Sequence, residues 1–210
     1  MTSSASAVAL DAAGVELVDR TMKAVVAPGS FFSAEDRVAI ARTARAARGA
    51  DSSAPALSAA RTDATRRVAA DAASIRPEMI KVWEASGLER LAYVELVSVV
   101  ARLVAIDSFV ASLGLPLTPL PAPPTGEVVA AVDPRAELSN AWVPTVGRAG
   151  ATTALSALPV EMAGVEQLHT ALYLPYAKVG ELVEDPGQVI SRPQMELVAA
   201  RTSWLNECFY

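Results

Sequence analysis

The residues best suited to chemistry lie close together near the end of the sequence, between positions 190 and 210. Cys208 is the only cysteine of the chain, and Glu196 is the single acid of an otherwise apolar helix that this stretch predicts. A thiolate can attack a peroxide or a disulfide. A carboxylic acid that is buried in an apolar helix has a raised pKa and can carry protons through water. The two residues therefore form a candidate redox and proton-transfer site.

The helix that must position these residues has clear start and stop signals. Ser191 and Gln194 form a capping box, and Pro193 occupies the first turn, where its missing N–H costs little. In one straight helix Glu196 and Cys208 would be about 18 Å apart along the axis. They can cooperate only if the chain bends near Asn206, whose side chain competes for backbone hydrogen bonds.

The stretch from Glu196 to Cys208 resembles the alkylhydroperoxidase D-like family, also called carboxymuconolactone decarboxylase-like. In that family such a helix runs into Asn-x-Cys-x-x-Cys, with a histidine four residues further on. Its redox members use the two cysteines as a peroxidatic pair, and a glutamate twelve residues before the first cysteine belongs to the proton relay. The resemblance thus implies that Cys208 is one member of the pair and that Glu196 is the relay acid.

The same resemblance implies a helical fold, a small hydroperoxide substrate, a thiol reductant and a homo-oligomer, commonly a trimer or hexamer in the family. The second member of the pair would be residue 211 and the histidine residue 215. We expect the sequence to be cut off just before that second member, with position 211 encoded by UGA and read as selenocysteine. A shortened chain or a degenerate gene is the alternative. This 210-residue chain is expected to be inactive, because one sulfur without its partner cannot turn over.

Two other function classes stay open. The chain could belong to a decarboxylase-like or isomerase-like group that acts on a small lactone, in which Cys208 need not matter. It could also be a non-catalytic assembly module. His169, the lone histidine, lies between leucines and is expected to be a satisfied structural residue. No spacing of histidines and acids suggests a metal site, and no glycine-rich loop suggests a nucleotide, so we expect neither metal nor cofactor.

Composition narrows the fold class and the partners. Hydrophobic residues make up 52 % of the 210 residues, much of it alanine, while aromatics make up 5 %. This balance favours an all-α fold of closely packed helices. The net charge of −5 argues against nucleic acid as the main partner. One cysteine fits a reducing, cytoplasmic location, and the first residues lack the basic segment of a signal peptide. The apolar run from Leu91 to Leu113 is broken by charges, so no membrane span is expected.

Apolar periodicity and breaking residues predict helices and a division of the chain. Helices are expected over 11–26, 34–47, 57–75, 78–86, 89–113, 149–158, 160–174 and 176–183, before a turn at 185–187 and the terminal helix. Residues 1–114 would form a degenerate helical unit, 115–147 a proline-rich connector, and 148–210 the start of a second unit. Trp142 to Pro144 would anchor the connector on the helical core.

The longest helix carries a polar seam. Glu95, Ser98 and Arg102 lie within about 60° of one another at 100° per residue. The seam could hold a site acid and its partner, but an exposed or subunit-facing seam is the favoured interpretation.

The two units share a weak repeat. Val38 to Ala44 resembles Leu197 to Ser203 at an offset of 159, while the capping residues Ser33 and Ser191 differ by 158. At the offset of 159, Glu196 corresponds to Arg37 and Cys208 to Gly49. A duplication would leave the second unit without covering helices, since a unit of this size rarely forms its own core. The terminal helix is therefore predicted to pack on the first half or on a neighbouring subunit.

Overall fold

The computed structural model describes residues 9–51, 56–181 and 189–208 and is all-α over those ranges, as predicted. Two short 3₁₀ turns, η1 (Ala72–Ser74) and η2 (Tyr176–Lys178), accompany the α-helices. The described α-helices are α1 (Ala12–Val26), α2 (Ala34–Ala47), α3 (Ala59–Ala70), α4 (Pro77–Ala85), α5 (Arg90–Ser112), α6 (Pro159–Leu172) and α7 (Arg192–Leu205).

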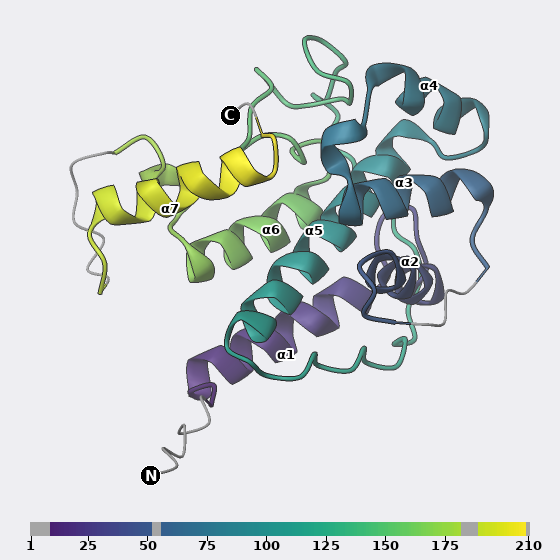
Figure 1. Cartoon of the computed structure of the whole chain (residues 1–210). Coiled ribbons are helices and arrows are strands. Elements are labelled where there is room, and N and C mark those ends of the chain that lie inside the picture. Colours follow the sequence, from purple (N-terminus) through teal and green to yellow (C-terminus); the bar gives the residue numbers. More distant parts are fainter. Residues whose placement is uncertain (1–8, 52–55, 182–188, 209–210) are drawn as a thin grey trace.

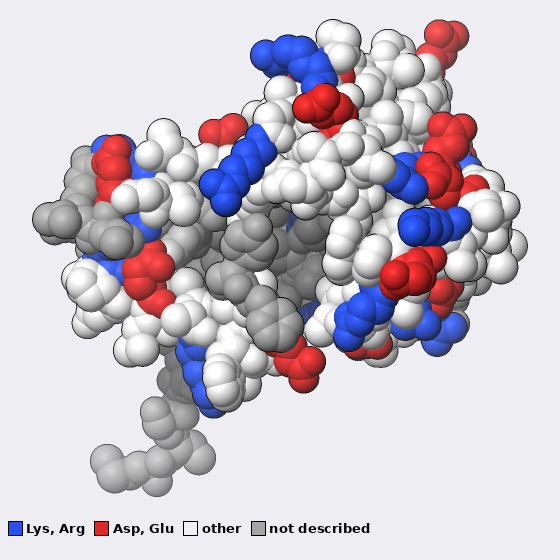
Figure 2. Space-filling view, turned by 90° about the horizontal axis from the view of Figure 1, so that it is seen from above, with Lys and Arg blue, Asp and Glu red and all other residues white. Residues whose placement is uncertain are grey.

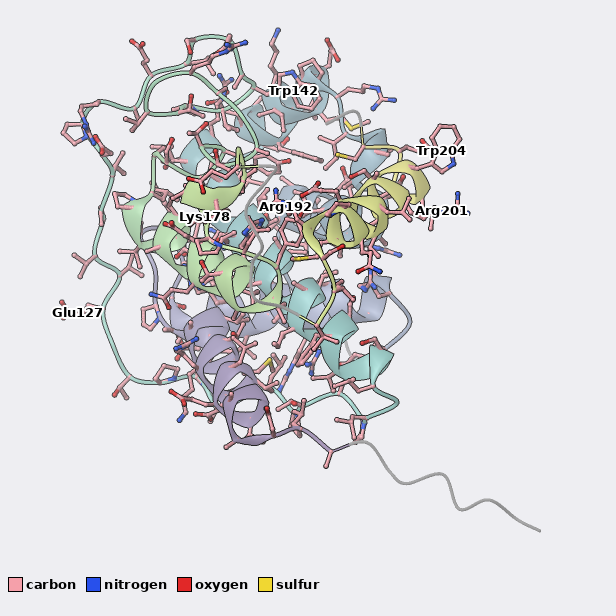
Figure 3. All side chains as sticks on the ribbon, turned by 90° about the vertical axis from the view of Figure 1, so that its left-hand side faces the viewer. Glu127, Trp142, Lys178, Arg192, Arg201 and Trp204 are labelled. Carbon is pink, nitrogen blue, oxygen red and sulfur yellow. The ribbon has the colours of Figure 1, made fainter. Side chains whose placement is uncertain are left out.

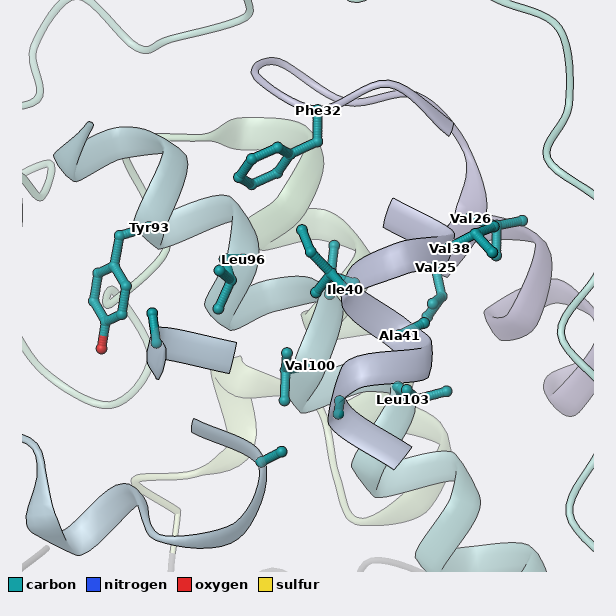
Figure 4. Packing of buried hydrophobic residues seen from close by; sticks show 14 of the residues in the cluster. Val25, Val26, Phe32, Val38, Ile40, Ala41, Tyr93, Leu96, Val100 and Leu103 are labelled. Atoms are coloured by element: carbon teal, nitrogen blue, oxygen red, sulfur yellow. The ribbon is translucent and has the colours of Figure 1, made fainter. Parts of the chain in front are cut away.

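Helix α5 is the centre of the molecule (Figure 1). Helices α1, α2 and α3 pack around it, and α6, which follows the proline-rich stretch in the sequence, also packs on it. Its side chains Val99, Val100 and Leu103 are fully buried in the main apolar cluster. Figure 4 shows Leu96, Val100 and Leu103 close to Ile40 and Ala41 of α2. A long helix with an apolar surface on several sides is expected to be covered in this way.

Alanine lets α2 approach its neighbours closely. Ala41 and Ala44 are fully buried, and α2 contacts α1, α3 and α5 together. Small side chains at a helix contact shorten the distance between helix axes and allow dense packing. The alanine-rich composition, from which close-packed helices were predicted, is thus found at the contacts of α2.

Local capping signals set the helix ends. Asp11 accepts a hydrogen bond from the Gly14 amide at 2.8 Å, and Ser33 accepts one from the Asp36 amide at 3.2 Å. Gly114 has a φ of 72° just beyond the end of α5, which is a conformation that glycine adopts without strain. These predicted ends are confirmed to within one residue.

The expected helix over 149–158 is wrong. Residues 151–157 instead form a succession of turns in which Thr153 donates through Oγ1 to Arg148 O at 3.0 Å. The hydroxyl of Ser156 donates to Thr153 O at 2.6 Å. Threonine and serine side chains thus bind backbone groups that a helix would need, which outweighs the helix propensity of the alanines. The predicted turn at 185–187 lies outside the described residues.

The proline-rich stretch contains no helix and is held to the helices at several points. Arg45 binds Asp107 through two hydrogen bonds of 2.9 and 2.7 Å and also donates to Thr118 O at 2.8 Å. Further on, the Val129 amide donates to Gly29 O at 3.2 Å. The stretch therefore runs along the loop between α1 and α2. Val143 packs on the apolar clusters.

Helices α2 and α7 have the same length and the same ends at an offset of 158. Each has 14 residues, and each follows a serine N-cap. After each helix comes a residue with positive φ, Gly49 at 74° and Glu207 at 52°. The next amide then bonds back five residues at 2.9 Å, from Ala50 to Arg45 and from Cys208 to Ser203. Duplication of the whole unit stays a prediction.

The prediction that α7 packs on the first half is wrong within the single chain. Arg192 and Met195 are its buried residues, and α7 has no extensive contact with α1 to α5. Figure 1 shows α7 beside α6 at the margin of the molecule. Packing of α7 on a neighbouring subunit stays a prediction.

Charged side chains of both signs are interspersed on the face drawn in Figure 2. Within the described residues, no helix combines the length and the apolar character that crossing a membrane requires.

Candidate functional site

Glu196 lies in a small polar cluster between α7 and the chain that follows α6. Its carboxylate accepts a hydrogen bond from the Tyr173 hydroxyl at 2.5 Å and pairs with Arg192 at 2.7 Å. The Arg192 guanidinium is almost fully buried and donates to Val179 O at 3.0 Å. Burial, followed by the hydrogen bond to Glu196, raises the pKa of Tyr173, so the hydroxyl keeps its proton at neutral pH. Glu196 and Tyr173 thus form a hydrogen-bonded acid pair.

The Glu196 side chain is 39 % exposed, in contrast to the buried setting that the apolar sequence suggested. The inner side of helix α7 buries Arg192 and Met195, whereas its outer side exposes large apolar residues around Arg201. The exposed residues Leu197, Val198, Trp204 and Leu205 fall within about 120° of the helix circumference. Figure 3 shows Trp204 and Arg201 directed away from the rest of the protein, while Arg192 lies on the inner side. We call these four apolar residues the outer face of α7.

Cys208 is an exposed free thiol just past the end of α7. The helix ends at Asn206, as predicted, and Glu207 then adopts a left-handed conformation. That conformation is uncommon for a residue with a side chain. It turns the chain so that the Cys208 amide bonds to Ser203 O at 2.9 Å. The thiol is therefore presented at the C-terminal end of the helix.

The bend at Asn206 does not bring the two predicted site residues together. The Cys208 amide is bonded to Ser203, which is seven positions after Glu196, or about 10 Å along the helix axis. Proton transfer between the two would have to cross that distance through water.

A second group of polar side chains is buried between α2, α5 and α6. Arg37 donates through Nε to Glu95 at 2.8 Å and also contacts Glu161. Arg102 contacts the other oxygen of Glu161. All four side chains are at most 5 % exposed. We call these two arginines and two glutamates the interhelical charge cluster.

The cluster is enclosed and internally neutral. The second oxygen of Glu95 accepts a hydrogen bond from the Phe31 amide at 2.7 Å. A Cβ added to Gly29 would lie 2.0 Å from Glu95 Oε1, so only glycine fits at that position. Burial, partly offset by the charge of Glu161, lowers the pKa of Arg102. A crevice of about 20 Å³ beside Arg102 has room for about one water.

These contacts correct the interpretation of the polar seam on α5. Glu95, Ser98 and Arg102 are buried inside the chain, so the seam is neither exposed nor subunit-facing. The acids and arginines satisfy one another, and the cluster joins α6 to α2 and α5. It therefore acts as a structural connection between segments far apart in the sequence. Ser98 is buried, and its hydroxyl has no hydrogen-bond partner among the residues that the structure describes.

His169 is a structural residue. Its Nδ1 lies 2.5 Å from Leu174 O, and its ring makes edge contacts with Tyr173 and Tyr176. It helps to hold the segment that carries Tyr173 and thereby positions the partner of Glu196.

Sequence reasoning missed Tyr173, Arg192 and Glu161. Arg192 and Glu196 are spaced by four residues on one helix, which is a visible pairing signal. Nothing local marks Tyr173 or Glu161, because their partners lie at least 23 residues away in the sequence. Comparison with known protein families, with curated proteins and with solved structures gave no match for this chain.

Proposed function

We propose that this protein is a thiol- or selenol-dependent peroxidase of the alkylhydroperoxidase D-like type, with Cys208 in the redox pair and Glu196 in the proton relay. The observation that carries the proposal is the hydrogen bond of 2.5 Å from Tyr173 to Glu196. The resemblance puts the relay acid at position 196. In this chain the carboxylate of Glu196 accepts a hydrogen bond from the Tyr173 hydroxyl, which is a group that carries a proton. The exposed thiol of Cys208 at the end of the same helix supports the same function.

The reaction needs a second chalcogen, which the proposal places three positions after Cys208 as cysteine or selenocysteine. Its anion attacks the distal peroxide oxygen, so that a new bond to oxygen forms while the O–O bond breaks. The leaving alkoxide takes a proton that Glu196 relays through water. The Cys208 thiol then attacks the oxidised centre, releasing water and closing a bridge. A dithiol reductant reopens this bridge and is itself oxidised.

The outer face of α7 supports a homo-oligomer as part of the proposal. Leu197, Val198, Trp204 and Leu205 expose 61–76 % of their surface on one side of a helix. Arg201 and Gln194 are exposed on the same arc, between these apolar side chains. Large exposed apolar side chains gathered on one side of a helix mark interaction sites more often than scattered single residues do. Burial of this face against another copy would also exclude water from the end of α7. The same observation favours a second candidate function, a non-catalytic assembly module.

Hydrogen peroxide consumption with dithiothreitol as the reductant separates these functions. Protein that carries this second chalcogen is expected to turn over. Cys208→Ser is expected to prevent the bridge and to slow turnover, because dithiothreitol must then reduce the oxidised centre directly. Glu196→Gln should slow it by about 10²–10⁴-fold, as for loss of a general acid or base. Glu166→Gln, which changes an exposed acid on α6, serves as the control and should keep full activity.

Three outcomes would oppose the peroxidase. Turnover at an unchanged rate in Cys208→Ser would remove Cys208 from the chemistry. Activity on a small lactone that is insensitive to Cys208→Ser would favour the decarboxylase-like alternative. No activity on either peroxide or lactone, together with an oligomer that depends on α7, would favour the non-catalytic assembly module.

A further inference from the structure

A cavity of about 400 Å³ lies between the first turns of α5 and the chain from residue 140 to 155. Val94 and Val97 line it from α5, and Trp142, Val143 and Leu155 line it from the later segment. Within the described part of the chain, no lysine, arginine, aspartate or glutamate lines it. The volume falls within the range of about 300–1,000 Å³ that is typical of small-molecule sites. The cavity is thus large enough for a ligand and offers it no charged partner.

One polar group on the α5 side is free to bind a ligand. Tyr93 is only 8 % exposed, and its hydroxyl makes no hydrogen bond within the described residues. Burial raises the pKa of Tyr93 to about 12, so the group is a hydrogen-bond donor at neutral pH. The hydroxyl oxygen itself stays accessible to water at the cavity, and a ligand acceptor would take the place of that water.

The position of Tyr93 is fixed from behind. Its ring packs on Trp83 with 5.4 Å between ring centroids, and the Trp83 indole donates to Asp63 at 2.9 Å. Asp63 is held in turn by Arg67 at 3.1 Å. Figure 4 shows the Tyr93 ring at the margin of the core. This chain of contacts holds the ring, and with it the hydroxyl, before any ligand arrives.

The opposite wall is also tied together by hydrogen bonds, although it contains no helix. The backbone groups of Glu137 and Thr145 pair with each other at 3.0 and 3.1 Å. The Val146 amide donates to the Ser156 hydroxyl at 2.8 Å, and Asn140 accepts from the Ala149 amide at 3.4 Å. Trp142 was expected to anchor the connector, but its side chain stays 50 % exposed beside the cavity. An exposed indole at the wall of an apolar cavity offers a face for stacking.

We propose that this cavity binds a small neutral molecule with an aromatic ring and a carbonyl acceptor, the ring against Trp142 and the carbonyl on the Tyr93 hydroxyl. A charged ligand would lose its hydration without gaining a partner, because the lining is uncharged. A purely aliphatic ligand would leave the Tyr93 hydroxyl unpaired. The proposal does not depend on Cys208 and stands apart from the peroxidase.

The probe for the test is 6-propionyl-2-dimethylaminonaphthalene, a neutral planar ketone whose fluorescence shifts to the blue in apolar sites. The 210-residue protein should bind it saturably with a blue shift. Tyr93→Phe removes only the hydroxyl and should weaken binding about two- to tenfold, as for one hydrogen bond. Ala154→Phe fills the mouth of the cavity from an exposed lining position and should abolish binding.

Ala111→Phe is the matched control, since Ala111 is an exposed alanine near the far end of α5, and it should bind like the unchanged protein. Circular dichroism of each variant verifies its fold. Binding that Ala154→Phe leaves intact would overturn the proposal, as would a Tyr93→Phe variant with unchanged affinity. Absence of saturable probe binding would also overturn the proposal. So would a loss of probe binding as the protein concentration rises, because a second copy of the chain would then fill the cavity.

Discussion

Glu161 is the residue whose replacement tests the interhelical charge cluster most sharply. It bridges Arg37 of α2 and Arg102 of α5 from its place on α6. Glu161→Gln keeps the shape of the side chain and removes its charge. Two arginines would then share one remaining acid, Glu95, in a site where every side chain is at most 5 % exposed.

The expected loss follows from that imbalance. Removing one partner of a buried ion pair costs about 3–5 kcal/mol, because the other charge stays buried without compensation. For a protein of this size, about 1 kcal/mol corresponds to a shift of roughly 2–4 °C in the melting temperature. Glu161→Gln should therefore lower the melting temperature by about 6–20 °C. The acid also holds α6, so amide exchange should rise first along that helix.

Urea unfolding followed by circular dichroism gives the free energies. The control Glu166→Gln changes an exposed acid on the same helix and should stay within about 0.5 kcal/mol of the unchanged protein. The double change Arg102→Met with Glu161→Met removes one charge of each sign and should recover most of the loss. A cost below about 1 kcal/mol for Glu161→Gln would refute the assignment of the cluster as a structural connection.

Three further changes test other parts of the structure. Gly29→Ala should lower the free energy of unfolding in urea by about 1–3 kcal/mol, because its Cβ would collide with Glu95. Gly180→Ala is the control and should be nearly neutral, because a Cβ there has no neighbour within 4 Å. Equal effects of the two changes would contradict the packing around Gly29. Burial raises the pKa of Tyr93 to about 12, so the stability that its neutral form contributes is fully present below pH 10 and is lost as pH rises toward 12. The loss in free energy of unfolding reaches up to about 3 kcal/mol. Tyr93→Phe should therefore flatten the alkaline part of a curve of stability against pH. An unchanged curve would show that Tyr93 ionises normally. Val198→Glu should dissociate the proposed oligomer, as measured by sedimentation velocity. Val82→Glu is the control, because both valines are 61 % exposed, and it should leave the oligomer intact. Identical sedimentation of the two variants would exclude the outer face of α7 as the contact.

The parts of the fold that could be predicted are those with local causes. Ser33 and Ser191 each begin a helix because a side-chain oxygen can satisfy a free amide a few residues later. Asn206 ends α7 for a similar reason. The same local reasoning failed over 149–158, where Thr153 and Ser156 compete with the helix for backbone groups.

The rest depended on contacts between distant residues. The spacing of Glu95 and Arg102 revealed a polar seam, but its burial depends on Arg37 and Glu161, which come from other helices. The sequence also indicated that α7 is largely apolar. It did not show which side meets the molecule, because that depends on the pairing of Arg192 with a segment that follows α6.

The measurement that tests the proposed function most directly is the state of Cys208 after one equivalent of hydrogen peroxide. Protein that carries the proposed second chalcogen is treated without reductant, digested and examined by mass spectrometry. We predict that the peptide containing Cys208 loses two hydrogens, because a bridge forms between Cys208 and the residue three positions later, and that dithiothreitol restores it. A Cys208 thiol that stays free while peroxide is consumed would contradict the account.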